Sequence, residues 1–182
     1  MNGFSPITPS IRWMIRKDLP AILACEEAAY GADSWSEEDF TRCLRQRNCI
    51  GMLAEQGDTL LGYMVYELHR DRLHLLNFVV HPDYQRRYIG AAMLDKLIGK
   101  LSQQRRTRIT LLINEGNMPA LRFFKAMGFM ATHVVWDAFP DVGEDGYAME
   151  LRVGAAVNAI TEQIHKQLVD AMPSTTVLRG SP

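Results

Sequence analysis

The sequence lacks a strong net charge and any long apolar run. Its 20 Lys and Arg residues nearly balance its 21 Asp and Glu residues, for a formal net charge of −1. Such a chain has no overall attraction to nucleic acid or to an anionic membrane. No stretch reaches the roughly 18 apolar residues that a membrane-spanning helix needs, and the first residues do not resemble a secretory signal. We therefore expect a cytoplasmic protein that binds neither nucleic acid nor membranes directly.

Cysteine is also scarce. The three cysteines are Cys25, Cys43 and Cys49. Their number is odd, and their spacing matches neither a metal site nor a redox motif. We predict buried or incidental thiols and no metal centre.

The composition itself is typical of a globular protein. The 182 residues are 47% apolar and 23% charged, which suits one domain with a substantial core. We predict a leader over residues 1–10, a folded domain over 11–152, and a C-terminal segment over 153–182. In that segment apolar residues recur at helical spacing, so we predict an amphipathic helix that packs back on the domain, with a partner or dimer surface as the alternative.

Local signals predict an alternation of helices and strands. A strand over 11–15 precedes a helix that begins at Asp18 and ends near Ala29, and Ser36 begins a second helix through an approximate capping box. Two short turns then connect three strands in an antiparallel meander. The predicted strands of the meander are 50–55, 59–69 and 72–81.

The sequence pattern in the second half of the domain predicts a parallel pair of strands. Apolar spacing indicates a helix over 89–101, followed by a buried strand over 108–113. Asn117 can cap a further helix that Gly128 ends, and the strands 129–136 and 147–152 form a final antiparallel pair. Because a strand, a helix and a strand in series give a parallel pair, we predict a mixed α/β (α+β) fold.

The segment NFVVHPDYQRRYIGAAML, residues 77–94, joins an apolar strand to a basic loop and an amphipathic helix. The first backbone N–H groups of a helix have no partner within it, and the helix dipole adds partial positive charge there. This arrangement predicts a phosphate site on residues 86–91. Tyr88 stands where such a loop usually carries glycine.

Three motifs together resemble the GNAT superfamily of acyl-CoA N-acetyltransferases, and within it the bacterial ribosomal-protein alanine N-acetyltransferases. They are SWSEEDF (34–40), the segment 77–94, and NMPALRFFKAMGF (117–129). The resemblance covers about 11–152. It implies a mixed, mostly antiparallel sheet of about seven strands flanked by helices, with a splayed parallel pair at the cofactor site.

The resemblance implies acetyl-CoA as the cofactor. Its pyrophosphate would bind the backbone of residues 86–91, and its pantetheine would pair like a strand with residues 78–80. Asn117 and Phe124 would complete the site. The predicted cofactor residues are Phe78, Val79, Val80, Gln85, Arg86, Arg87, Tyr88, Ile89, Gly90, Ala91, Asn117 and Phe124.

Tyr88 allows two conformations. A positive φ would cost a tyrosine on the order of 1 kcal/mol or more. An ordinary helical φ would require only that the ring point away from the ligand. Because the residue enters a helix, we favour the helical φ.

The resemblance also locates the proton-transfer groups, and here this sequence differs. The positions at which the family carries its catalytic base and acid are occupied here by Leu112 and Phe124. Neither side chain can accept or donate a proton. We name His74 as the candidate catalytic base, because an imidazole titrates near neutral pH, with Glu115 as an alternative. A structural role for the histidine is the competing interpretation.

The acceptor is expected between the loops 30–35 and 138–146. The candidate substrate residues are Tyr30, Trp35, Asp141 and Tyr147. Acidic residues in the second loop would attract a cationic amine.

We therefore predict direct acetyl transfer to the α-amine of a protein or peptide, with a ribosomal protein as one candidate acceptor. A small-molecule amine is an alternative acceptor. A further alternative is an impaired acyl-CoA-binding protein, because of Leu112 and Phe124. The sequence leaves open whether the protein is a monomer or a homodimer.

Overall fold

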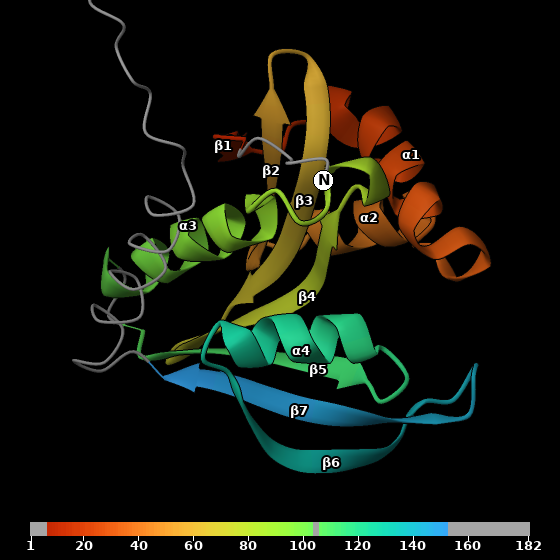
Figure 1. The fold of residues 1–182 in the computed structure, drawn as a ribbon, viewed down its shortest axis with the longest axis vertical. Coiled ribbons are helices and arrows are strands. Elements are labelled where there is room, and N and C mark those ends of the chain that lie inside the picture. The colour runs from red at the N-terminus through yellow and green to blue at the C-terminus, as the bar shows by residue number, and fades with distance from the viewer. Residues whose placement is uncertain (1–6, 104–105, 153–182) are drawn as a thin grey trace, which may run out of the picture.

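The computed structural model describes residues 7–103 and 106–152. Within them the chain forms one seven-stranded sheet with the strand order β1-β2-β3-β4-β5-β7-β6 (Figure 1). The predicted C-terminal helix of residues 153–182 lies outside the described residues, as does most of the leader. The strands are β1 Ser10–Trp13, β2 Cys49–Gln56, β3 Thr59–Leu68, β4 Arg72–Val80, β5 Arg108–Asn114, β6 Met130–Phe139 and β7 Glu144–Arg152.

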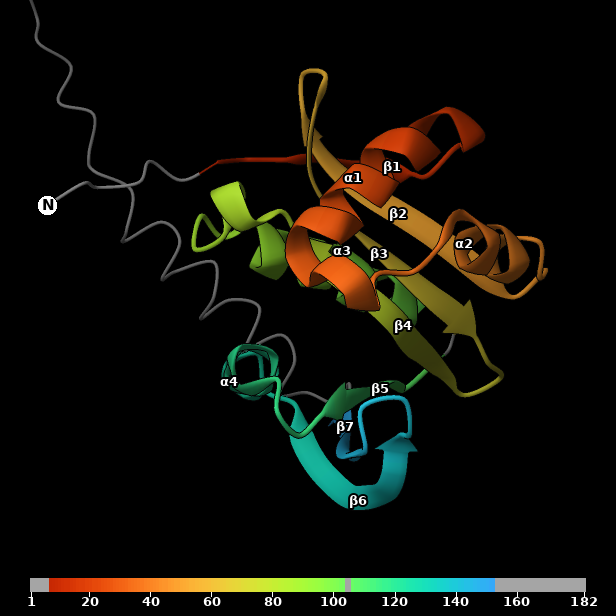
Figure 2. The same cartoon turned by 90° about the vertical axis from the view of Figure 1, so that its right-hand side faces the viewer.

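In the described part of the chain, four α-helices cover the sheet: α1 Leu19–Tyr30, α2 Glu37–Leu44, α3 Ile89–Gln103 and α4 Met118–Ala126. Buried residues of α1 and α2 share one apolar core with β2, β3 and β4, while residues of α3 and α4 share the other. The two pairs of helices therefore lie on opposite faces of the sheet (Figure 2). No helix among the described residues is long and apolar enough to cross a membrane.

The predicted helix starts are confirmed. The side chain of Ser36 accepts a hydrogen bond from the backbone N–H of Asp39, whose carboxylate accepts one from Ser36 in return. Asn117 caps α4 by accepting a hydrogen bond from the N–H of Ala120. These short-range bonds satisfy N–H groups that the helices leave free, which is why local sequence was sufficient to locate them.

The splayed parallel pair is also confirmed. Strands β4 and β5 pair only from Arg72 with Arg108 to Leu75 with Leu111. Beyond this point β4 continues to Val80 and β5 to Asn114 without a shared ladder. The edge of β4 that faces β5 is therefore open over its last residues.

A bulge in β4 changes which face its side chains reach. The register with β3 shifts between Val65 and Tyr66, so that Leu76 is the extra residue. Leu75 before the bulge and Phe78 after it both pack on the α3 and α4 core, whereas a regular strand would send them to opposite faces. His74 therefore does not share a face with Phe78.

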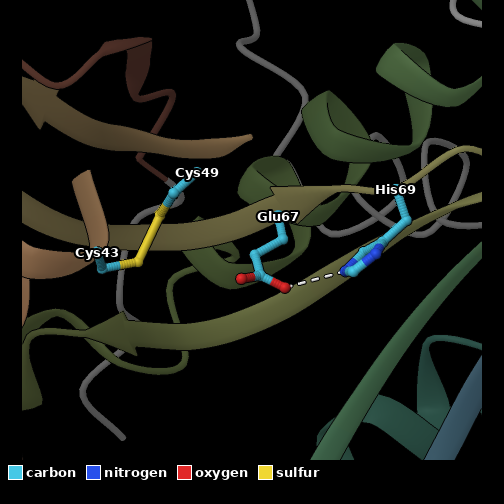
Figure 3. Close-up of a disulfide and its surroundings, with 4 residues drawn as sticks. All are labelled: Cys43, Cys49, Glu67 and His69. Atoms are coloured by element: carbon cyan, nitrogen blue, oxygen red, sulfur yellow. Dashed lines mark hydrogen bonds and ion pairs between the residues drawn. A yellow bond between two sulfur atoms is a disulfide. The ribbon is translucent and has the colours of Figure 1, made fainter. Parts of the chain in front are cut away.

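The cysteines differ from the prediction. Cys43 at the end of α2 and Cys49 at the start of β2 form a disulfide, with 6.1 Å between their Cα atoms (Figure 3). The interpretation of incidental thiols was wrong for this pair, because the chain between α2 and β2 turns back and brings the two together. Cys25 is a buried free thiol.

Candidate active site

The predicted phosphate site lies in the loop between β4 and α3. After the short helix η3, Pro82–Tyr84, the chain enters α3 through the basic segment QRRY. The N–H of Ala92 donates to the carbonyl of Tyr88 at 3.0 Å, so the helical ladder begins at this residue. The first N–H groups of α3 are thus directed toward the loop, where an anion can accept from them.

Tyr88 adopts the conformation that the sequence analysis did not favour. Its φ is 65°, and that of Arg86 is 60°. The expectation of a helical φ at Tyr88 was wrong, because the loop must reverse direction before α3 begins. The residue is 42% exposed, so the side chain turns toward solvent while the backbone carries the strain.

Gly90 has a packing role within the same loop. A Cβ atom at this position would lie 3.2 Å from the ring of Phe123 and 3.5 Å from a methyl group of Val80. The absence of a side chain allows α3 to approach α4 and β4 closely. The glycine therefore positions the start of α3.

A cleft of about 760 Å³ lies beside the open edge of β4. Its lining includes three of the predicted cofactor residues, Phe78, Asn117 and Phe124. It also includes Tyr30, Trp35 and Asp141, which the sequence predicted for the acceptor. One cleft therefore joins the two predicted halves of the site.

Other predicted residues lie around the cleft or away from it. The side chain of Val79 is buried in the α1 and α2 core, and that of Val80 packs on the opposite core. Any contact of these two residues with a ligand would therefore use their backbone. Tyr147 packs against the α3 and α4 core and does not line the cleft.

Leu112 and Phe124 both line the cleft, at the positions where the resemblance implies a base and an acid. Phe124 is only 5% exposed and contacts the ring of Phe78 edge to face at 5.5 Å. Leu112 is exposed. Neither side chain can accept or donate a proton, so any proton transfer in this cleft requires other groups.

His74 lies in a separate depression of about 380 Å³ between β4, β5, β7 and β6. Its Nδ1 is 3.0 Å from Oγ1 of Thr110, and burial lowers the pKa of the imidazole, which the nearby carboxylate of Glu67 partly opposes. His74 as a catalytic residue thus stays a prediction, without a place in the cleft. Glu115 does not line the cleft either, and its carboxylate accepts a hydrogen bond from the N–H of Asp145.

The structure adds Glu26, which the sequence analysis did not select. This residue of α1 is only 1% exposed, yet it lines the cleft. Its Oε1 accepts hydrogen bonds from the N–H of Trp35 at 3.0 Å and from Nδ2 of Asn77 at 3.2 Å, and its Oε2 accepts one from the hydroxyl of Tyr63. A signal was present: Glu26 follows the buried Ile22 by four positions, on the apolar face of α1.

The charge of Glu26 affects its neighbours. Burial and then this negative charge raise the pKa of Tyr63 and of Tyr30, and they raise the pKa of Cys25 to about 12. The phenol of Tyr63 therefore stays protonated near neutral pH and remains a donor. Asn77 also donates to the Tyr63 oxygen at 3.1 Å, which closes the hydrogen-bond network.

A parallel strand pair that opens beside a helix N-terminus and a deep cleft defines a transferase that binds an acyl-CoA donor. The Acetyltransferase (GNAT) family profile matches residues 11–129, and the chain belongs to this family. It is an acetyl-CoA-dependent N-acetyltransferase, as the sequence predicted.

The similar proteins include a ribosomal-protein alanine N-acetyltransferase. The [ribosomal protein bS18]-alanine N-acetyltransferase of Escherichia coli (strain K12) is 29% identical over 138 residues, which are 75% of this chain and 92% of that protein. The crystal structure of the Escherichia coli ribosomal-protein-S18-alanine N-acetyltransferase is 25% identical, with a TM-score of 0.72 over 82% of this chain and 96% of that one. Ard1 from Thermoplasma volcanium shares the fold at 20% identity, with a TM-score of 0.73 over 81% and 99% of the two chains.

Proposed function

We propose that the acceptor is the α-amine at the N-terminus of a protein or peptide. The observation that carries this proposal is the composition of the cleft. On one side it reaches Phe78 and Phe124, where the thioester would lie, and on the other it reaches Trp35 and Asp141 in two separate loops. A cleft bounded by two loops can admit the end of a peptide, and its carboxylates suit a cationic amine.

For the donor, we propose that the pyrophosphate binds at the first N–H groups of α3, beside Arg86 and Arg87. The pantetheine would lie along the open edge of β4, where the backbone of residues 76–80 has no partner strand on the β5 side. Two amides in the pantetheine can pair with such an edge as an added strand would. This arrangement directs the thioester toward Phe124 and the cleft.

The transfer is direct in this proposal. The neutral amine attacks the thioester carbon, and backbone donors stabilise the negative charge that develops on the oxygen. The cleft offers no side-chain acid at Phe124, so the leaving thiolate would take its proton from the amine nitrogen or from water. A cationic amine must first lose a proton.

The ribosomal acceptor is the more specific part of the proposal. It is supported by the similar Escherichia coli enzyme, whose name identifies an alanine of ribosomal protein bS18 as its target. A ribosomal acceptor would imply action in the cytoplasm.

A second candidate function is acyl-CoA binding without transfer. Leu112 and Phe124 favour it, because they remove both proton-transfer groups that the resemblance implies. A small amine is the other alternative acceptor. The same experiment separates all three.

The experiment combines titration calorimetry with acetyl-CoA and an assay of thiol release. Three acceptors are compared: an alanine-initiated peptide with its lysines blocked, the same peptide with a blocked N-terminus and a free lysine, and a polyamine. We expect acetyl-CoA binding and thiol release only with the free α-amine. Binding of acetyl-CoA without thiol release on any amine would contradict the proposal. Preference for the lysine peptide or the polyamine would show that the acceptor is a lysine side chain or a polyamine and not an α-amine.

A further inference from the structure

We infer that Glu26 receives the proton of the acceptor amine and that Tyr63 is the positioning residue that holds its carboxylate. This inference rests on the proposed function. It addresses the absence of a proton acceptor at Leu112. Among the described residues that line the cleft, the acidic side chains are Glu26 and Asp141, and only Glu26 is buried.

Hydrogen bonding leaves Glu26 with room for one more donor. An ionised carboxylate offers about four lone-pair positions. Trp35 and Asn77 occupy the two on Oε1, and Tyr63 occupies one on Oε2. Among the described residues no further donor occupies the remaining position, on Oε2, and in this inference the ammonium group of the acceptor binds there.

Charge also favours an ammonium group at this position. No Lys, Arg or His forms an ion pair with Glu26 within the described part of the chain. A buried carboxylate with neutral donors alone attracts a cation strongly, since solvent screens it little.

Tyr63 sets the orientation of the carboxylate. Its ring is fully buried and lies 5.6 Å from the ring of Phe40, which in turn lies 5.3 Å from Trp35. The hydroxyl therefore comes from a rigid element, and it stays protonated because its pKa is raised. Without this bond Oε2 would be free to rotate away from the acceptor path.

The reaction balances with Glu26 in this role. One proton passes from the ammonium group to Oε2, and the neutral nitrogen then forms the bond to the thioester carbon. The carbon–sulfur bond breaks, and the leaving thiolate takes a second proton from the nitrogen, directly or through water. Glu26 returns its proton to solvent, so that one ammonium and one thioester give one amide, one thiol and one proton.

The test compares Glu26→Gln with Glu27→Gln, which removes the same charge from the next, exposed position of α1. Each variant is assayed with an alanine-initiated peptide and with its aminooxy analogue, whose amine is already neutral at pH 7. We expect Glu26→Gln to lower kcat/KM about 100-fold on the alanine peptide and less than about 10-fold on the analogue. Glu27→Gln should stay within about twofold of the wild type on both.

Tyr63→Phe provides a second variant that keeps the buried ring. It should lower kcat about 10-fold with unchanged affinity for acetyl-CoA, and it should move the acid limb of the pH profile of kcat/KM to higher pH. That shift is expected because the ionised carboxylate loses a donor.

Three results would overturn the inference: an equal loss on both acceptors in Glu26→Gln, no loss in that variant, and an unchanged pH profile in Tyr63→Phe. If Glu26→Gln does not fold, the pH profile of Tyr63→Phe decides alone. If the wild type acetylates no amine, the proposed function itself fails, whereas an active wild type with an unaffected Glu26→Gln rejects only this inference.

Discussion

The hydroxyl of Tyr63 donates a hydrogen bond to the carboxylate of Glu26, 37 positions earlier in the chain. The bond connects strand β3 to helix α1, and Asn77 of β4 donates to both partners. Buried polar groups without such partners would cost about 1–3 kcal/mol each. The hydrogen bonds of this network therefore offset the free-energy cost of burying the carboxylate of Glu26 at the wall of the cleft.

Replacing Tyr88 with glycine tests the strain in the cofactor loop. Glycine adopts a φ of 65° freely, and the exposed ring contributes little burial, so Tyr88→Gly should raise the free energy of unfolding by about 1 kcal/mol. The affinity for acetyl-CoA should also increase, because the backbone becomes accessible to the pyrophosphate. Urea unfolding and calorimetry measure the two effects.

Tyr88→Ala is the matched control, because it removes the ring but keeps the Cβ atom at positive φ. It should give no gain in stability. An equal gain from both variants would show that the ring, rather than the backbone angle, is the source of the cost.

Replacing His74 with glutamine tests the base that the sequence predicted. A catalytic base would show a fall in kcat of about 100-fold or more with acetyl-CoA affinity kept. Because the imidazole lies in a separate depression and contacts Thr110, we expect kcat to change by less than about twofold. Steady-state kinetics on the wild type and His74→Gln decide between the two.

Thiol titration tests the disulfide. Cys43 and Cys49 are paired, and Cys25 is buried with its pKa raised to about 12. The folded, unreduced protein should therefore react slowly with an aromatic disulfide reagent, and unfolding in denaturant should release one thiol per chain. Cys25→Ser should release none, and three thiols from the unreduced wild type would contradict the pairing.

The ion pair of Asp18 predicts a pH dependence of stability. Arg12 donates two hydrogen bonds to this carboxylate, at 2.8 and 2.9 Å, and lowers its pKa below the ordinary 3.8. The unfolded state then binds the proton more readily, so the contribution is complete well above 3.8 and is lost as the pH falls through the lowered pKa. Asp18→Asn should lose about 1 kcal/mol at pH 7.

The difference in the free energy of unfolding between the wild type and Asp18→Asn should disappear as the pH falls toward 2. Urea unfolding over this pH range measures it. Asp58→Asn is the control, because Asp58 lies in the exposed turn between β2 and β3 and should show a small, nearly constant difference. A difference in the free energy of unfolding that persists at low pH would show that Asp18 stabilises the fold through the shape of its side chain and not through its charge.

Several elements of the fold could be predicted because their causes are local. Ser36 and Asn117 begin helices through bonds to residues three positions ahead, and the turn at Gly57 connects adjacent strands. The strand, helix and strand around α3 allowed a parallel pair to be predicted. The sequence also predicted where the loop before α3 lies in the chain. It did not predict the φ of Tyr88, because that angle depends on how the loop packs against the rest of the fold.

The catalytic assignment could not be reached in the same way. The bulge at Leu76 separates the faces of His74 and Phe78, although alternation along a regular strand would have joined them. Bulges depend on the pairing of two strands and leave little trace in one of them. The disulfide likewise required that the end of α2 and the start of β2 be placed next to each other.

By itself, the sequence determined the order of the elements, the basic loop at the start of α3 and the family, because each depends on neighbouring residues or short motifs. Only the tertiary structure decided which polar groups meet in the cleft. Glu26, Tyr63 and Asn77 come from three elements, and their hydrogen bonds form only when α1 packs on β3 and β4. The physical reason is that a carboxylate becomes functional through its burial and its partners, and both are properties of the assembled core.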